Sequence, residues 1–232
     1  MKQSPKEVAY AFLAAYYPNC SVAILAGSVA RNEAKAGSDL DIVLIDEQEK
    51  YMSRFCLEMD GWPIEAFVYN SLSFHTFFES ECMLGNPALP RMCAEGIILK
   101  GGQVAEELIR EAKIKIEQGP LPWTDDQINY SRYMITDTLD DFIHAKDEAE
   151  RLCIVNYLEN LVQEFILRTN KRWTGQGKWM ARAFREYNTE QAEVFFHAFD
   201  QFYKNRKSEP LIAYIDQILN PYGGRLFNGY KQ

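Results

Sequence analysis

The residues with the clearest chemical potential are three carboxylates between positions 39 and 65. Asp39 and Asp41 stand two positions apart at an apolar run, so in a strand both side chains point to the same face. Glu65 lies within a second apolar run, where a carboxylate seldom lacks a partner. Carboxylates this close repel one another unless a cation lies between them, and oxygen ligands suit Mg²⁺. We predict a cation site from these three residues. Asp46 falls on the opposite face or past the strand and is a poor ligand.

A glycine-serine step precedes this acidic pattern. Gly27-Ser28 ends the apolar run Ser21–Ala26 and leads into a predicted short helix, Val29–Ala34. The backbone N–H groups and the positive dipole end of such a turn favour a phosphate, and glycine lets the ligand approach closely. The Ser28 hydroxyl adds a donor. Arg31 is close enough in sequence to reach the same anion, although a surface role suits it equally.

These residues together resemble the signature of the DNA polymerase β-like nucleotidyltransferase superfamily. Residues 23–45 match well, and Glu65 matches the family's third carboxylate, whereas Asn32 stands where glycine is common. The resemblance implies two Mg²⁺ ions held by Asp39 and Asp41, with Glu65 as third ligand or as general base. It also implies that Ser28 and nearby backbone N–H groups bind the β,γ-phosphates of ATP or another nucleoside triphosphate. The reaction that we expect moves a nucleoside monophosphate, AMP from ATP, to a hydroxyl group of a small molecule and releases pyrophosphate.

The remaining pattern predicts two domains. Residues 1–119 read as an α/β (α+β) domain with a mixed sheet, because short apolar strands alternate with helical patterns and Asp60-Gly61 is a strong hairpin signal. Gly119-Pro120-Leu121-Pro122 interrupts any helix, and residues 120–232 read as an all-α helical bundle. The expected strands are Ser21–Ala26, Leu40–Ile45, Phe55–Met59, Trp62–Tyr69 and Ile97–Lys100, and the expected helices are 5–17, 71–83, 88–94, 103–117, 125–146, 148–169, 178–187, 189–205 and 208–219.

This layout also resembles the antibiotic nucleotidyltransferases that act on aminoglycosides and lincosamides, which implies a small-molecule acceptor bound by the helical domain. Asp137, Asp140 and Asp141 share one helix face with His144. They form either a solvated face or the wall of a pocket for a cationic acceptor. Lys178, at the start of a predicted helix, either reaches a phosphate of the nucleotide or lies in a turn.

The excess of acidic over basic residues limits the classes of molecule that this protein is expected to bind. The chain has 25 Lys+Arg against 33 Asp+Glu, a net charge of −8, and residues 1–120 hold 11 of the basic and 17 of the acidic residues. This balance argues against a nucleic-acid partner. We expect no membrane span and no secretory signal. The five cysteines are scattered and form no CxxC pair, which indicates reduced, mostly buried thiols in a cytoplasmic protein. Three alternatives stay open: a protein acceptor, an RNA acceptor, and a catalytically silent nucleotide-binding module. The chain is expected to be a monomer or a homodimer.

Overall fold

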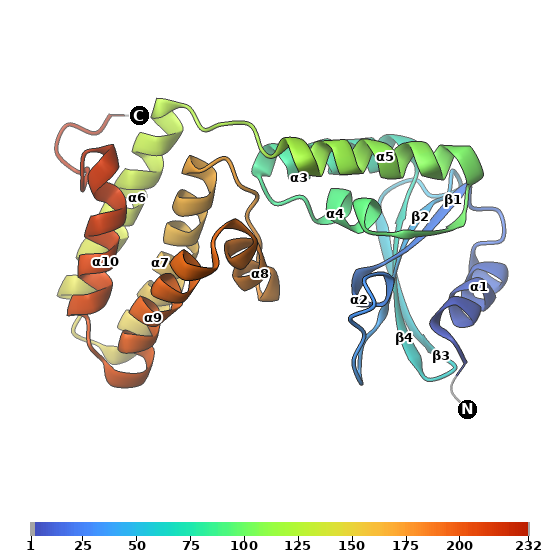
Figure 1. The fold of residues 1–232 in the computed structure, drawn as a ribbon, viewed down its shortest axis with the longest axis horizontal. Coiled ribbons are helices and arrows are strands. Elements are labelled where there is room, and N and C mark those ends of the chain that lie inside the picture. The colour runs from blue at the N-terminus through green and yellow to red at the C-terminus, as the bar shows by residue number, and fades with distance from the viewer. Residues whose placement is uncertain (1–2, 232) are drawn as a thin grey trace. The chain divides into compact units, whose positions relative to one another are not determined.

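The computed structural model describes residues 3–231, which divide into two compact units between Gly119 and Pro120. Figure 1 shows the mixed sheet in the first unit and the helices of the second. None of the helices in residues 3–231 combines the length and the apolar composition that a bilayer span requires. All five cysteines are free; three are buried and two, Cys56 and Cys153, are exposed.

The N-terminal unit is built on one mixed sheet, as the sequence predicted. Within the described residues its five strands lie in the order β3-β4-β2-β1-β5, and β2 and β4 run parallel while the other neighbours are antiparallel. The elements in chain order are α1 (Pro5–Tyr16), β1 (Val22–Ala26), α2 (Gly27–Ala30), β2 (Leu40–Ile45), β3 (Ser53–Met59), β4 (Trp62–Tyr69), α3 (Ser71–Leu84), α4 (Ala88–Ala94), β5 (Ile97–Lys100) and α5 (Gly102–Gln118).

Helix α1 packs against one face of this sheet. Phe12 is fully buried, in one apolar cluster with Leu25 and Ile42 from the central strands. Helices α4 and α5 lie against β1, and α3 lies against β4. Successive side chains of each strand point to opposite faces of the sheet, so every second one packs into the apolar cluster beneath α1 and the others face the opposite side.

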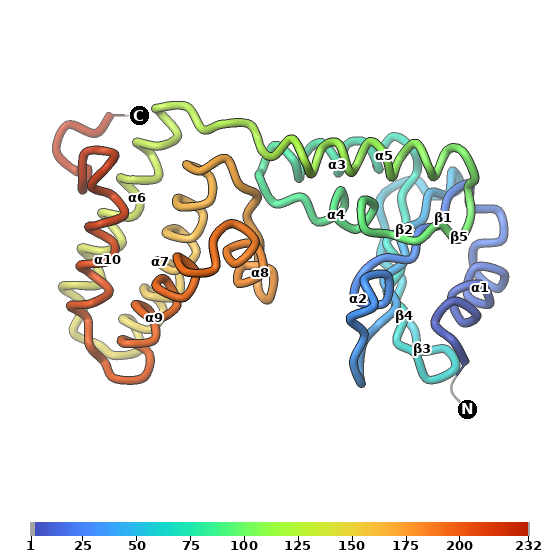
Figure 2. Tube along the Cα trace, in the orientation of Figure 1, coloured from blue at the N-terminus to red at the C-terminus, as the bar shows by residue number. Residues whose placement is uncertain are grey.

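The C-terminal unit is helical throughout its regular elements. Its core is rich in phenylalanine, with Phe142, Phe165, Phe195 and Phe202 all fully buried. The segment after the last helix returns toward α6 (Figure 2). There, Leu226 N–H donates to Thr136 Oγ1. The elements are α6 (Asp125–His144), α7 (Glu148–Thr169), α8 (Lys178–Tyr187), α9 (Thr189–Asn205), α10 (Glu209–Leu219) and a 3₁₀ turn (Asn220–Tyr222).

One element differs clearly from its prediction. The helix expected over Val29–Ala34 is a single turn, Gly27–Ala30, which begins earlier and ends earlier. It ends because Asn32 adopts a left-handed backbone with φ of 58°, and Glu33 N–H then bonds back to Ser28 C=O. Asparagine tolerates this conformation better than most residues with a side chain.

Candidate active site

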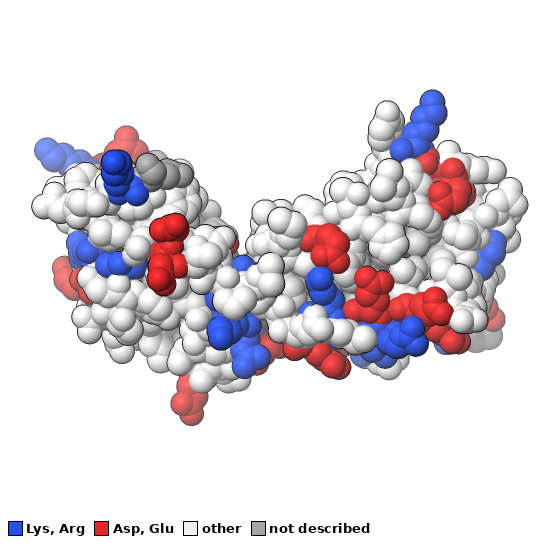
Figure 3. Space-filling view, turned by 90° about the horizontal axis from the view of Figure 1, so that it is seen from above, with Lys and Arg blue, Asp and Glu red and all other residues white. Residues whose placement is uncertain are grey.

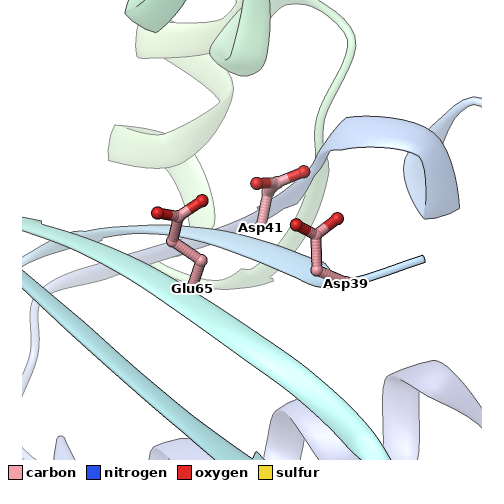
Figure 4. Close-up of side chains that lie close together, drawn as sticks. All are labelled: Asp39, Asp41 and Glu65. Carbon is pink, nitrogen blue, oxygen red and sulfur yellow. The ribbon is translucent and has the colours of Figure 1, made fainter. Parts of the chain in front are cut away.

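The sheet brings the three predicted carboxylates together. Asp39 directly precedes β2, Asp41 lies on β2, and Glu65 lies on β4, where the parallel pairing places it beside Asp41. One carboxylate oxygen from each residue lies within 4.8 Å of the other two, and all three residues are half-buried. Figure 4 shows the three side chains on the same side of the sheet. Within residues 3–231, this is the one group of three or more His, Cys, Asp or Glu residues with such spacing.

The donor chemistry of this group fits Mg²⁺. Carboxylate oxygens are hard ligands, and Mg²⁺ is commonly held by one or two carboxylates together with substrate phosphates. Asp46 does not join the group: it follows the end of β2, and its carboxylate accepts a hydrogen bond from Gln48 N–H. The residues present therefore offer ligand atoms of a type, and close enough together, that could hold a divalent cation.

Gly27 makes room for one of these ligands. A Cβ atom added at Gly27 would lie 1.8 Å from Asp41 Oδ2, far inside van der Waals contact. Ala26 is the register partner of Asp41 across the β1–β2 pair, so the turn after β1 necessarily passes this carboxylate. Gly27 also has a φ of 69°, which favours glycine. Gly27 and Asp41 are thus packed so closely that a larger residue at position 27 would displace the Asp41 carboxylate.

The turn at Gly27-Ser28 lies next to this carboxylate. Ala26, the residue before α2, has no side-chain acceptor of its own, and the first N–H groups of a helix have no carbonyl partner within the helix. These groups and the Ser28 hydroxyl belong to the same strand-to-helix turn as Gly27. The arrangement suits an anion that arrives together with a cation on Asp41.

Arg31 is engaged elsewhere in the structure. Its Nε lies 3.0 Å from Glu33 Oε2 and its Nη1 lies 2.9 Å from Glu95 Oε2. Its side chain is only 18% exposed. A nucleotide phosphate would have to compete with two carboxylates for this guanidinium, so nucleotide binding by Arg31 stays a prediction.

Arg54 also lies at the acidic group, although it is not among the predicted site residues. Arg54, on β3, places Nη1 3.0 Å from Glu65 Oε1. The signal was present in the hairpin: a two-residue Asp60-Gly61 turn pairs Met59 with Trp62, and counting back pairs Cys56 with Glu65. Arg54 is then the diagonal neighbour of Glu65, within reach of a long side chain.

The other predicted residues belong to the C-terminal unit. Asp137 is half-buried and Asp141 is exposed on α6. Asp140 lies 3.4 Å from Arg225 Nη1, and that same guanidinium binds Asp216 at 2.7 Å. The ion pair gives Asp140 a structural partner, while acceptor binding by the three aspartates stays a prediction.

Two further features of the C-terminal unit bear on the predictions. Lys178 is exposed at the first position of α8, and its contact with a phosphate also stays a prediction. His144 Nδ1 lies 2.8 Å from the backbone oxygen of Asp140, one turn earlier on its own helix. On the face shown in Figure 3, acidic and basic side chains are interspersed over both units.

Comparison with known proteins identifies the fold. No family model matches the chain, and no curated protein matches it in sequence. Among solved structures it is similar to the crystal structure of a nucleotidyltransferase-like protein from Exiguobacterium sibiricum 255-15, with a TM-score of 0.51 and 8% sequence identity. The similarity covers 94% of this chain and 75% of that one. The predicted architecture, a mixed-sheet domain followed by a helical domain, is confirmed: the chain has a nucleotidyltransferase-like fold.

Proposed function

We propose that this chain is a divalent-cation-dependent nucleotidyltransferase that moves a nucleoside monophosphate, AMP from ATP, to a hydroxyl group of a small molecule. The observation that carries this proposal is the meeting of Asp39, Asp41 and Glu65 beside the Gly27-Ser28 turn, on a fold of this kind. Three carboxylates within 4.8 Å of one another repel, and Arg54 offsets the charge of one of them, Glu65. A site that only bound a nucleoside would have no need of them.

In this proposal each residue of the site has one role in binding the cation or the nucleotide, or in transferring a proton. Asp39 and Asp41 would hold the cations, and Glu65 would be either a third ligand or the base that takes the acceptor's proton. Mg²⁺, when bound, supplies neutralisation of the triphosphate and of the pyrophosphate that leaves. The acceptor oxygen forms a bond to the α-phosphorus, the bond from that phosphorus to the bridging oxygen breaks, and pyrophosphate departs with the electron pair. Ser28 and the backbone N–H groups of its turn would orient the β,γ-phosphates.

For the acceptor we propose a cationic small molecule such as an amino sugar. The support is the net charge of −8 and the carboxylates Asp137 and Asp141 on one helix of the C-terminal unit. Asp140 contributes less to this attraction because it is paired with Arg225. Protein or RNA acceptors lack such support, and the acidic balance disfavours RNA.

The proposal is tested by turnover. The full chain is incubated with Mg²⁺, ATP labelled at the α-phosphate and a panel of aminoglycosides, lincosamides and neutral alcohols, and both pyrophosphate and labelled acceptor are measured. We expect transfer to at least one acceptor, and a loss of about a thousandfold or more in Asp39→Asn plus Asp41→Asn because the cation ligands are gone. Glu79→Gln is the matched control, since Glu79 is an exposed carboxylate on α3 that pairs with Lys115.

Two outcomes would contradict the proposal. Absence of transfer to every acceptor, with nucleotide affinity unchanged in the double aspartate variant, would indicate a silent nucleotide-binding module. Adducts of AMP mass on proteins of a cell lysate, without any small-molecule product, would indicate a protein acceptor.

A further inference from the structure

Arg54 lies against the acidic group, and the proposed chemistry gives it no role. It is on β3, which forms one edge of the sheet, and its Nη1 is 3.0 Å from Glu65 Oε1. Its guanidinium carbon lies 4.7 Å from the centre of the Phe67 ring. Arg54 is the register partner of Phe67, and Phe67 stands two residues after Glu65, so the three side chains share one face of the sheet. The hairpin itself therefore holds this guanidinium beside the third carboxylate.

The pairing gives the acidic group its own counter-cation. Arg54 neutralises one of three mutually repelling carboxylates, and a divalent cation that binds Glu65 must share that carboxylate with it. A positive charge beside a ligand oxygen also reduces the attraction of the whole group for a free cation. The Arg54 side chain is 55% exposed, so it can turn away from Glu65 without opening the core.

A nucleotide offers Arg54 a second anionic partner. Guanidinium carries five N–H donors in a planar fork that matches phosphate oxygens as well as carboxylates. The phosphates of a bound nucleotide would lie near Asp41 and the Gly27-Ser28 turn, on the same side of the sheet as Glu65. When a nucleotide is present, Arg54 can exchange the carboxylate for a phosphate, which leaves Glu65 free for the cation.

We propose that Arg54 couples cation binding to nucleotide binding, so that this site favours a cation that arrives with a nucleotide over a free one. The inference rests on the proposed function, because it takes the ligand to be a nucleoside triphosphate. In the absence of nucleotide, Arg54 occupies Glu65 and weakens binding of the free cation. In its presence, the phosphates hold Arg54, and cation and nucleotide strengthen each other's binding.

The test measures each ligand alone and both together. Mn²⁺ is the cation probe, followed by electron paramagnetic resonance, and α,β-methylene-ATP is the nucleotide because it cannot transfer its AMP group. We expect Arg54→Gln to bind free Mn²⁺ about tenfold more tightly, or about 1.4 kcal/mol. We expect the same variant to bind the nucleotide analogue in saturating Mn²⁺ about tenfold more weakly. Arg54→Lys keeps the charge and should stay near wild type in free Mn²⁺ binding.

Lys115→Gln is the matched control. It removes a cation from an exposed ion pair with Glu79 in the same unit, at 3.1 Å, and should change neither affinity. Melting temperatures of all variants show that each one is folded at the assay temperature.

The outcomes separate the two proposals. If the wild type binds Mn²⁺ and the analogue but Arg54→Gln alters neither affinity, the inference about Arg54 is overturned and the proposed function stands. Glu65→Gln removes a carboxylate of the group and is expected to weaken free Mn²⁺ binding. If Arg54→Gln weakens it too, Arg54 only orients Glu65 and the coupling is again overturned. If the wild type binds Mn²⁺ but no analogue, the proposed function itself fails, and the coupling with it.

Discussion

Replacing Gly27 by alanine tests whether the Gly-Ser turn and the acidic group form one unit. The added Cβ would meet Asp41 Oδ2 at 1.8 Å, whereas ordinary contact begins near 3.4 Å, so the carboxylate must move by the difference of about 1.6 Å. Metal–oxygen distances for Mg²⁺ are about 2.0–2.1 Å, so such a displacement breaks the bond from this ligand. We expect cation affinity to fall at least about tenfold and transfer to fall about a hundredfold.

Gly37→Ala is a matched control for this substitution. Gly37 has a φ of 85°, close to the 69° of Gly27, but a Cβ there would meet no atom within 4 Å. Both alanines carry the cost of a left-handed backbone, about 1–2 kcal/mol, and both gain some stability from a less flexible unfolded chain. We therefore expect similar losses in the free energy of unfolding from urea titrations of the two variants. Only Gly27→Ala should lose Mn²⁺ binding and AMP transfer.

The reasoning is refuted if the two alanine variants bind Mn²⁺ equally well. In that case the Asp41 carboxylate can move aside and still ligate, and the close contact with Gly27 has no part in holding the cation. A loss of unfolding free energy several kcal/mol larger in Gly27→Ala than in Gly37→Ala would also refute it, because the contact would then be needed mainly for folding.

Three further predictions concern the thiols, the pH dependence of stability and the acceptor. A bulky maleimide at pH 8 should modify the exposed Cys56 and block transfer, because Cys56 is the register partner of Glu65. Burial raises the pKa of Cys93 to about 12, which keeps that thiol unreactive. The variant Cys56→Ser should therefore resist inactivation. Burial raises the pKa of Glu81 above 4.5, so the contribution of this carboxyl group to stability is lost as the pH rises through the folded-state pKa. In urea titrations from pH 4 to 8, the free energy of unfolding should therefore decline less in Glu81→Gln than in the wild type. Parallel curves for the two proteins would contradict this prediction. Asp141→Lys should raise the acceptor KM by about two- to fivefold and leave the ATP KM unchanged, and two unchanged constants would indicate a solvated helix face.

Local signals explain most of what the sequence could predict. Ser4 and Thr124 form capping boxes at the starts of α1 and α6, and these two helices end within two residues of their predicted ends. The Asp60-Gly61 hairpin forms because both turn residues reach positive φ, 50° and 75°. These features depend on neighbours in the chain, which a single sequence displays directly.

Pairings between distant residues could not be predicted in the same way. Arg31 lies next to the Gly-Ser step in sequence, yet it binds Glu95, 64 positions away. Asp140 lies on the helix face expected to bind the acceptor, yet it pairs with Arg225, 85 positions away. In both cases an ion pair brought about by the fold competes with the proposed ligand, and no pattern of spacing reveals such a competitor.

The cation site itself depends on how the sheet is packed. Ile64 and Ala66, the neighbours of Glu65 on β4, are almost completely buried in the cluster that contains Phe12 of α1. A slip of one residue in the β2–β4 register would turn Glu65 into this apolar core and expose both neighbours. Burying an unpaired carboxylate there costs several kcal/mol, a large share of the stability of a small domain. The apolar alternation that stabilises the sheet therefore also keeps Glu65 beside Asp41, so the geometry of the site is a consequence of the core.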